Sequence, residues 1–250
     1  MKLPRVIPLL LIEGNRLIKT KNFSRGKYVG DPLNVIKIFN KKEVDEIAIL
    51  DISKNRKEPN YNLLKNMAEE CFVPLAYGGH IKNIETASKI FKLGFEKVII
   101  NNEFLENPNS IRLISKQFGS QSVIVSIDIK KNWRNKLKVF SNKKNKILSS
   151  ITIDDLFQKA ISCGAGEILL QLVHLEGTGN GNEDIPLKNF TPKCPLPIII
   201  SGGCSSLEHI SKYLSNGADA VACGSFFCFY GPHKAVLITY PNKSELEKLK

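Results

Sequence analysis

Two segments of this 250-residue chain repeat one another, and this repeat limits the possible folds more than any other feature. The run Pro74-Leu75-Ala76-Tyr77-Gly78-Gly79 is echoed by residues 197–203, which end in Ser201-Gly202-Gly203. Further along, apolar runs that end at Asn101 and Ser225 are separated by the same interval of 124 residues (203 − 79 and 225 − 101). A chain that repeats a buried strand, a glycine turn, a helix and a second strand is predicted to consist of two similar halves.

Eight short apolar runs alternate with amphipathic stretches along the chain. Continuous hydrophobicity is typical of strands buried on both faces of a parallel sheet. Helix-start signals lie between the runs, since Asp31-Pro32 and Asn107-Pro108 each place proline in a first helical turn. Eight strand–helix units favour an α/β fold of the (β/α)8 TIM-barrel type, built from two half-barrels as one domain over residues 1–250. The predicted strands are residues 6–12, 46–51, 74–77, 97–100, 123–129, 167–172, 197–201 and 220–223.

Two of the predicted connections are unusually long. Residues 13–30 follow the first strand and include Lys19, Lys21 and Lys27, which favours a mobile lid over the C-terminal face of the barrel. Residues 130–148 follow the fifth strand, are strongly basic, and are expected to form a hairpin around residues 137–140. A last helix is expected over residues 244–250, opened by a serine cap.

The net charge of +12 raises the question of nucleic-acid binding. Only six of the 36 basic residues are arginine, and the lysines are spread along the whole chain. Base and phosphate recognition relies on the planar fork of arginine, so we expect a solvated basic surface that attracts phosphorylated small molecules, and no nucleic-acid partner.

The apolar content bears on the membrane and the redox compartment. No stretch approaches the ~20 apolar residues that cross a bilayer, and the first residues do not read as a secretory signal. We therefore expect a cytoplasmic protein without membrane contact. The six cysteines form no CxxC pair and lie mostly in apolar runs, so they are predicted to be reduced core residues. Neither a metal site nor a cofactor is expected.

The motifs together resemble the HisF family, the cyclase subunit of imidazole glycerol phosphate synthase. Proteins of that family are (β/α)8 barrels built from two fused half-barrels. The resemblance extends from Arg5 to about Phe229. The segments that carry it include Val6-Ile7-Pro8, Gly30-Asp31-Pro32, Leu50-Asp51-Ile52, Tyr77-Gly78-Gly79, Ser126-Ile127-Asp128, Gly177-Thr178 and Ser201-Gly202-Gly203.

The chain is still more similar to a branch of that family associated with acetamidino modification of surface sugars. Barrels of that branch are thought to work with a glutaminase and a separate sugar amidotransferase. The resemblance therefore implies a HisH-like glutaminase partner in a heterodimer, a sugar amidotransferase as a further partner, and a phosphorylated small-molecule ligand. The features that point to the branch are Leu9-Leu10-Leu11 and residues 27–32, 69–74 and 229–237.

The resemblance also identifies catalytic positions. The barrel cyclase uses two aspartates, one at the end of the first strand and one at the end of the fifth. The second is present here as Asp128, whereas Leu11 occupies the position of the first. Proton transfer in opposite directions requires two carboxylates whose pKa values differ, so impaired or absent cyclase chemistry is expected. Asp128 remains a predicted catalytic residue, and Lys19 matches the lysine of the cyclase lid.

The two halves are expected to differ as phosphate sites. Glycine turns expose backbone N–H groups to an anion, but the third glycine of the first turn is here His80. Its Cβ would obstruct an anion, or its protonated ring would pair with one. A metal shared by His80 and His174 is disfavoured, because no carboxylate or cysteine accompanies them at ligand spacing. The matching positions are Gly79, Asn101 and Asn102 in the first half, and Gly177, Thr178, Gly202, Gly203, Gly224 and Ser225 in the second.

Four charged residues at strand starts match the ammonia gate of the family. They are Arg5, Glu46, Lys97 and Glu167. Such a quartet is also compatible with a salt-bridged barrel floor that only stabilises the fold. Because all four match, we favour docking of a glutaminase and conduction of ammonia toward amidino modification of a sugar. The alternatives are a genuine cyclase of histidine biosynthesis and a non-catalytic activator of the glutaminase.

Overall fold

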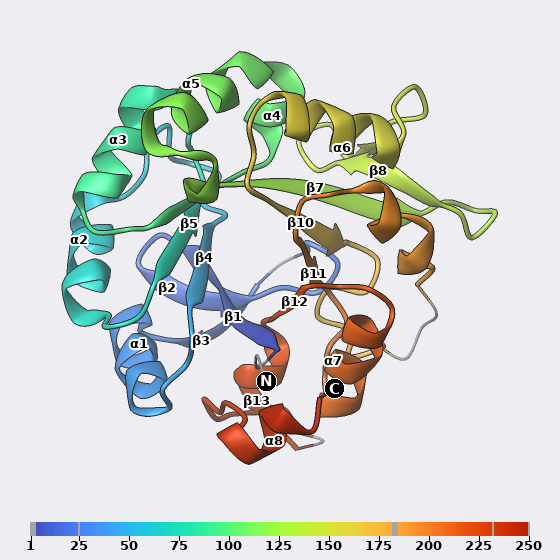
Figure 1. The fold of residues 1–250 in the computed structure, drawn as a ribbon. Helices are drawn as coiled ribbons and strands as arrows, with labels where there is room; N and C mark the ends of the chain where they lie inside the picture. Colours follow the sequence, from blue (N-terminus) through green and yellow to red (C-terminus); the bar gives the residue numbers. More distant parts are fainter. Residues whose placement is uncertain (1–3, 25, 182–184, 232, 250) are drawn as a thin grey trace.

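The computed structural model describes residues 4–24, 26–181, 185–231 and 233–249. Eight parallel strands close a barrel, which confirms the predicted fold class (Figure 1). Each predicted strand is present within two residues of its expected bounds. Around the barrel the order is β1 (Arg5–Glu13), β4 (Ile47–Asp51), β5 (Leu75–Gly78), β6 (Lys97–Ile100), β7 (Val123–Lys131), β10 (Glu167–Leu172), β11 (Ile198–Ser201) and β12 (Ala220–Cys223), which pairs again with β1.

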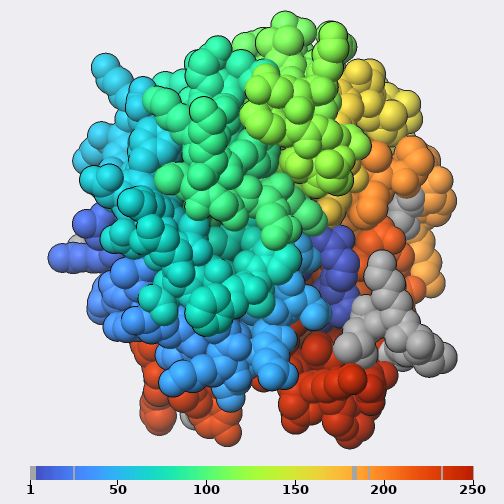
Figure 2. Space-filling model, turned by 60° about the vertical axis from the view of Figure 1, so that its left-hand side comes forward, coloured from blue at the N-terminus to red at the C-terminus, as the bar shows by residue number. Residues whose placement is uncertain are grey.

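Helices cover the outside of the barrel, and in the space-filling view α2, α3 and α5 form a continuous surface over the strands (Figure 2). The Asp31 side chain accepts a hydrogen bond from Asn34 N at 3.0 Å, so the predicted start of the first helix is confirmed. The helices are α1 (Pro32–Lys41), α2 (Tyr61–Glu70), α3 (Ile84–Lys92), α4 (Asn102–Glu106), α5 (Pro108–Phe118), α6 (Ile153–Ser162), α7 (Leu207–Ser215) and α8 (Lys243–Glu247), with short 3-10 turns η1 (Ser120–Ser122), η2 (Leu187–Asn189), η3 (Thr191–Lys193) and η4 (Ser225–Phe227).

The last helix corrects the sequence prediction. α8 begins at Lys243 and ends at Glu247, and the expected end at Lys250 lies outside the described residues. Its cap is Asn242 rather than a serine, because Asn242 and Glu245 exchange hydrogen bonds of 3.0 Å and 2.8 Å in a capping box. The two reciprocal bonds satisfy two free N–H groups at this helix start, whereas Ser244 lies two residues further along, inside the helix.

The hydrophobic residues of the strands divide between two cores. Alternate strand residues face the helices and form the larger core, in which Ile12, Ile49 and Val125 are fully buried. The other residues face the barrel axis and form a second, narrower core of mostly small side chains. The inner core consists of Ile7, Leu9, Ala48, Ala76, Ile99, Ile124, Leu169, Ile199, Ala220 and Ala222.

Two strand extensions rise from the C-terminal ends of β1 and β7. The segment 13–30, predicted as a loop forming a mobile lid, contains β2 (Arg16–Lys19) and β3 (Lys27–Gly30), which continue the sheet antiparallel to β1. The loop prediction was therefore wrong in form. The predicted basic hairpin is confirmed as β8 (Leu137–Ser141) paired with β7, followed by β9 (Lys146–Ile147). A small hairpin near the C-terminus joins β13 (Phe229–Tyr230) to β14 (Ala235–Val236).

The strand register gives a different interval between equivalent residues of the two halves than the repeated sequence motifs do. Ala76 pairs with Lys97 in the first half, and Ile199 pairs with Ala220 in the second, so the interval at these strands is 123 residues (199 − 76 and 220 − 97). The turns follow the same interval, because Asn101 and Gly224 both have φ near −110° and ψ near −78°. The interval of 124 residues aligns the glycines of the two sequence motifs, but it shifts the structurally equivalent turns by one residue.

Candidate functional site at the C-terminal mouth

The mouth of the barrel, defined as the C-terminal ends of its eight strands, is polar on one side and apolar on the other. Side chains from β7, β10 and β11 that face the axis are polar, whereas Leu9, Leu11 and Leu50 face it from β1 and β4. Asn101 Nδ2 donates to Ser126 O at 3.1 Å, and Gln171 Nε2 donates to Ser126 Oγ at 3.4 Å. The polar side consists of Asn101, Ser126, Asp128, Gln171 and Ser201.

Asp128 is the ionisable group of this polar side. It is 5 % exposed near the end of β7 and pairs in register with Gln171. Burial raises the pKa of Asp128 to about 7, against the lowering effect of a hydrogen bond from Asn101. A carboxyl group with that pKa can both release and accept a proton near neutral pH. A catalytic role of Asp128 stays a prediction, and the raised pKa is compatible with it.

Leu11 occupies the corresponding position in the first half. Leu11 pairs with Leu50 of β4, just as Asp128 pairs with Gln171 of β10. The interval between Leu50 and Gln171 equals the interval between Glu46, which directly precedes β4, and Glu167, which begins β10 (171 − 50 and 167 − 46, both 121). The register thus places an apolar side chain where the second carboxylate of a symmetric pair would lie.

A small recess in the second half brings together most of the predicted phosphate-binding positions. It encloses about 30 Å³ and is lined by residues of β1, β2, β10, β11 and β12 and of the turns that follow these strands. Gly202 has φ +117°, and a Cβ there would lie 2.7 Å from Leu172 O, so this turn requires glycine. The predicted residues that line the recess are Lys19, Gly177, Gly202, Gly203, Gly224 and Ser225.

Lys19 closes this recess from above. Its side chain is 4 % exposed, and Nζ donates a hydrogen bond to Leu9 O beside Gly224. Burial lowers the pKa of Lys19, while nearby groups that include Glu176 oppose the shift. The lysine thus lies over the predicted phosphate turn rather than in solvent.

Glu176 connects the β1–β2 extension to the loop after β10. Thr20 Oγ1 donates to Glu176 Oε2 at 3.0 Å, and Asn22 N donates to Glu176 O at 2.9 Å. Burial raises the pKa of Glu176, and the Lys19 charge lowers it. These contacts hold residues 20–22 against the loop after β10, in the second half of the mouth.

The first half of the mouth has a different polar cluster. His80 has φ +55° and follows Gly79, so in the strand register it replaces Gly203. Its Nε2 is buried without a hydrogen-bond partner and lies 3.9 Å from Asp51 Oδ1. The Asp51 side chain is fully buried and accepts hydrogen bonds from Ser53 N at 2.9 Å and Tyr77 Oη at 3.3 Å. A glycine turn at this position would expose backbone N–H groups to an anion. Here the imidazole of His80 lies at that position, beside the carboxylate of Asp51.

Several predicted positions are not brought into the second-half recess. Gly79 and Asn101 lie in the first half, and Asn102 starts α4 with an exposed side chain. Thr178 does not line the recess, because its hydroxyl donates to Leu175 O at 2.7 Å within its own turn. Of the nine predicted phosphate positions, five line the second-half recess, Thr178 lies beside it, and three lie in the first half.

Neither histidine of the mouth belongs to a metal site in the described residues, where no group of three or more His, Cys, Asp or Glu side chains is arranged to hold an ion. His174 lies in the loop after β10, and burial together with Lys131 and Lys130 lowers its pKa to about 4. His80 instead faces Asp51. The six cysteines are all free thiols, five of them buried, as predicted for core residues.

At the floor of the barrel, defined as the N-terminal ends of the strands, the four predicted gate residues form a closed ionic ring. Arg5 contacts Glu46 at 2.7 Å and Glu167 at 3.0 Å, and Lys97 contacts Glu167 at 2.5 Å and Glu46 at 3.5 Å. Burial disfavours the charged form of Arg5, but the two carboxylates prevail and raise its pKa. The ring has no net charge and lies directly below the apolar inner core.

Sequence reasoning did not single out Asp51, Gln171, Ser126 or Ser201 as site residues. A usable signal existed for the last three, because each interrupts an apolar strand at an inward position. Asp51 points to the helix side of the sheet, and only the fold brings it beside His80. Among the described residues, no helix combines the length and hydropathy needed to span a membrane.

The fold and the mouth together define a class of protein: a two-half (β/α)8 barrel with an ionic floor and, at its mouth, a buried aspartate beside a glycine-lined recess. A family model described as "Histidine biosynthesis protein" matches residues 5–233, and the chain belongs to this family. It is 43 % identical over 252 residues to a protein of Leptospira borgpetersenii, provisionally named imidazole glycerol phosphate synthase subunit HisF, with 98 % of each chain covered.

Two further relatives differ in how they are named. A Pseudomonas aeruginosa protein with the provisional name imidazole glycerol phosphate synthase subunit hisF2 is 43 % identical over 246 residues, covering 97 % of this chain and 98 % of the relative. The imidazole glycerol phosphate synthase subunit HisF of Dictyoglomus turgidum is 37 % identical over 227 residues, covering 90 % of each.

Proposed function

We propose that this barrel docks a HisH-like glutaminase at its floor and conducts ammonia to its mouth, for amidino modification of a surface-polysaccharide sugar, with cyclase chemistry impaired or absent. One observation carries the proposal. The ionic ring of Arg5, Glu46, Lys97 and Glu167 is complete, whereas Leu11 stands at the first-half position that corresponds to Asp128. A protein selected only for conduction of ammonia would keep the ionic ring and would not need a carboxylate at position 11.

The layers of the barrel interior support passage of a neutral molecule. Above the ionic ring, the axis is lined by the apolar inner core, where Ala48, Ala76, Ala220 and Ala222 leave little side-chain bulk. Transfer of the ammonium ion from water into such surroundings costs much free energy, because its charge is left unpaired. Transfer of neutral ammonia costs far less. The polar side of the mouth then provides amide and hydroxyl groups that receive ammonia.

The floor also offers a surface for a partner. A hollow of about 470 Å³ lies beside the ring and is lined by Phe91, Phe95 and Phe118 together with Lys97 and Glu167. Aromatic walls next to charged groups are typical of the centre of a protein interface. Exposed Phe72 lies on the same face, just before β5. The relatives are named as subunits, which supports assembly with a second chain.

The genuine cyclase is the second candidate, and it is favoured by Asp128, whose pKa of about 7 suits acid–base chemistry, and by the second-half recess under Lys19. An assay of ammonia-dependent turnover of the phosphoribulosyl substrate at alkaline pH, without partner, separates the two. Turnover at an ordinary enzymatic rate, near the ~10 s⁻¹ median, would refute impaired chemistry. Installing the missing acid with Leu11→Asp is the matched gain-of-function variant.

Conduction is tested on the reconstituted complex with the glutaminase and the sugar amidotransferase of the same organism. Lys97→Leu breaks the ring, and we expect ammonia to leak to bulk solvent, so that glutamine is hydrolysed without matching amidation. Lys92→Leu on the outer face of α3 is the control. Unchanged delivery by Lys97→Leu would refute conduction and leave the third possibility, a non-catalytic activator of the glutaminase.

A further inference from the structure

The exposed hydrophobic side chains of this protein are concentrated around the mouth. Seven large hydrophobic residues are exposed among those described. Two of them lie on the strand extensions from β1 and β7, and three lie on or directly after the small hairpin of β13 and β14. The other two are Phe72 at the floor and Leu113 on α5. The five are Trp133 (83 % exposed), Tyr230 (68 %), Tyr28 (57 %), Leu237 (48 %) and Val236 (47 %).

These residues flank the mouth on opposite sides. Trp133 is at the tip of the hairpin that leaves β7, and Tyr28 is on β3, which is joined to β1 through β2. β1 and β7 face each other across the barrel, because three strands separate them in either direction. Lys27 ties β3 to the C-terminal hairpin, since its Nζ lies 5.2 Å from the Phe229 ring centre.

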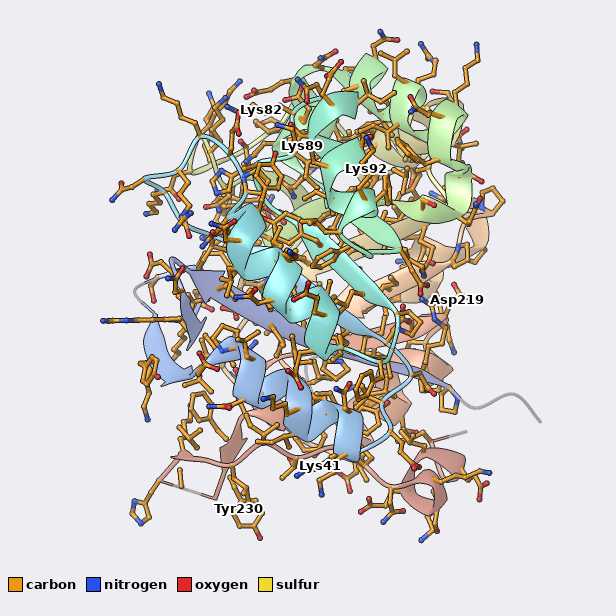
Figure 3. All side chains as sticks on the ribbon, turned by 90° about the vertical axis from the view of Figure 1, so that its left-hand side faces the viewer. Lys41, Lys82, Lys89, Lys92, Asp219 and Tyr230 are labelled. Atoms are coloured by element: carbon orange, nitrogen blue, oxygen red, sulfur yellow. The ribbon has the colours of Figure 1, made fainter. Side chains whose placement is uncertain are left out.

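A side view of the barrel separates the two ends. Tyr230 is on the side where Lys82 follows the turn after β5, and Asp219, which precedes β12, is on the opposite side (Figure 3). The mouth rim, defined as Tyr28, Trp133, Tyr230, Val236 and Leu237 with the extensions that carry them, is therefore remote from the floor. The hairpin of β7 and β8 projects beyond the outline of the barrel (Figure 1).

The β7 extension is also the most strongly charged segment of the chain. Residues 130–148 contain eight lysines and arginines and no aspartate or glutamate. One of these cations, Lys143, is paired with Glu106 at 2.8 Å. Such a charge density beside the mouth attracts an acidic surface and speeds its association.

The tip of this extension is held in one conformation. Asn132 Oδ1 accepts hydrogen bonds from Arg134 N at 3.0 Å and Lys136 N at 2.9 Å, and the Arg134 guanidinium lies 4.2 Å from the Trp133 ring centre. A preordered tip loses little entropy on binding. Trp, Tyr and Arg are the residues that contribute most to protein interfaces.

We propose that the mouth rim is a second docking face, opposite to the floor, for the enzyme that consumes the ammonia, and that this enzyme presents an acidic surface with apolar recesses. The inference rests on the proposed function, since it supplies the acceptor of the conducted ammonia. A protein occupant fits better than a lipid surface, because the aromatic groups are separated across the mouth and Arg134 covers the Trp133 ring. Docking on both sides of the mouth shields the transferred ammonia from water.

The test measures binding of the sugar amidotransferase to the barrel–glutaminase complex in the absence of glutamine, so that no chemistry is involved. We expect Trp133→Ala to weaken binding at least tenfold, and Lys136→Glu with Lys146→Glu to weaken it further and reduce its salt dependence. The matched control reverses two exposed lysines on the barrel side, Lys41→Glu with Lys92→Glu (Figure 3). Glutaminase binding should be unchanged in the rim variants, Trp133→Ala and Lys136→Glu with Lys146→Glu.

A photoreactive benzoylphenylalanine at position 133 or 230 should cross-link the amidotransferase from both sides of the mouth, whereas position 113 should not. The proposal is overturned if rim variants and controls bind alike, or if the cross-links lie elsewhere. It is equally overturned if phosphatidylglycerol vesicles or an oligonucleotide, rather than the amidotransferase, lose binding with Trp133→Ala. Amidation with added ammonium chloride tests the proposed function separately, because that reaction needs no docked barrel.

Discussion

Replacing Asp128 with asparagine should stabilise the protein at alkaline pH and leave its stability unchanged in acid. Asp128 is 5 % exposed, and burial raises its pKa to about 7 from the ordinary value of 3.8. The folded protein therefore holds a proton on this group that the unfolded chain has released between these two pH values. Asparagine has nearly the same shape and no charge to bury.

The size of the effect follows from the two pKa values. Their difference of 3.2 (7 − 3.8) corresponds to about 4 kcal/mol, at 1.36 kcal/mol for each factor of ten. Because the folded pKa is the higher one, the cost is absent below pH 3.8, grows as the pH rises, and is complete above pH 7. Asp128→Asn should thus gain up to about 4 kcal/mol at pH 8.5 and almost nothing at pH 4.

Urea unfolding at pH 4, 6 and 8.5 measures this difference directly. Glu85→Gln is the control, because Glu85 is an acidic residue in the first turn of α3, away from the mouth. A gain that does not depend on pH, or a loss of stability at pH 8.5, would refute the reasoning. Either result would mean that Asp128 is charged and well solvated by its neighbours, and the proposed acid–base role at neutral pH would lose its physical basis.

Four further predictions concern other parts of the molecule. Arg5→Ala leaves Glu46 and Glu167 without their guanidinium partner and should lower the free energy of unfolding by about 3 kcal/mol in urea titrations. Gly202→Ala, with φ +117° and a Cβ 2.7 Å from Leu172 O, should cost at least ~2 kcal/mol and abolish phosphate binding in calorimetry, whereas Gly30→Ala has open space and should do neither. His80→Gly should gain about 1 kcal/mol by removing a left-handed non-glycine residue, and unchanged affinity for bisphosphorylated ligands would show that the first turn is not an anion site. Labelling of the native protein with a thiol reagent should modify Cys71 alone, and slowly below pH 9, because burial raises the pKa of this half-buried thiol.

The sequence alone determined the architecture. Continuous apolar runs at regular spacing define parallel strands, and the resulting barrel has the predicted strands within two residues. The architecture follows from local hydrophobic pattern and topology. The four floor residues were identified by the resemblance to the HisF family, and the closed sheet brings them together, because residues at the start of parallel strands meet at one end of a barrel. They are Arg5, Glu46, Lys97 and Glu167.

The tertiary structure decided what the sequence left open or misjudged. Repeated glycines suggested an interval of 124 residues, but strand register sets it at 123 and makes His80 the counterpart of Gly203. Lys19 was expected on a loop, yet pairing of β2 with β1 buries its amine over the second-half recess. Asp51 could be recognised as part of the His80 cluster only from the fold, in which neighbouring strands place its Oδ1 3.9 Å from His80 Nε2. Register, burial and pKa depend on groups distant in sequence, whereas strand periodicity is a local property of the chain.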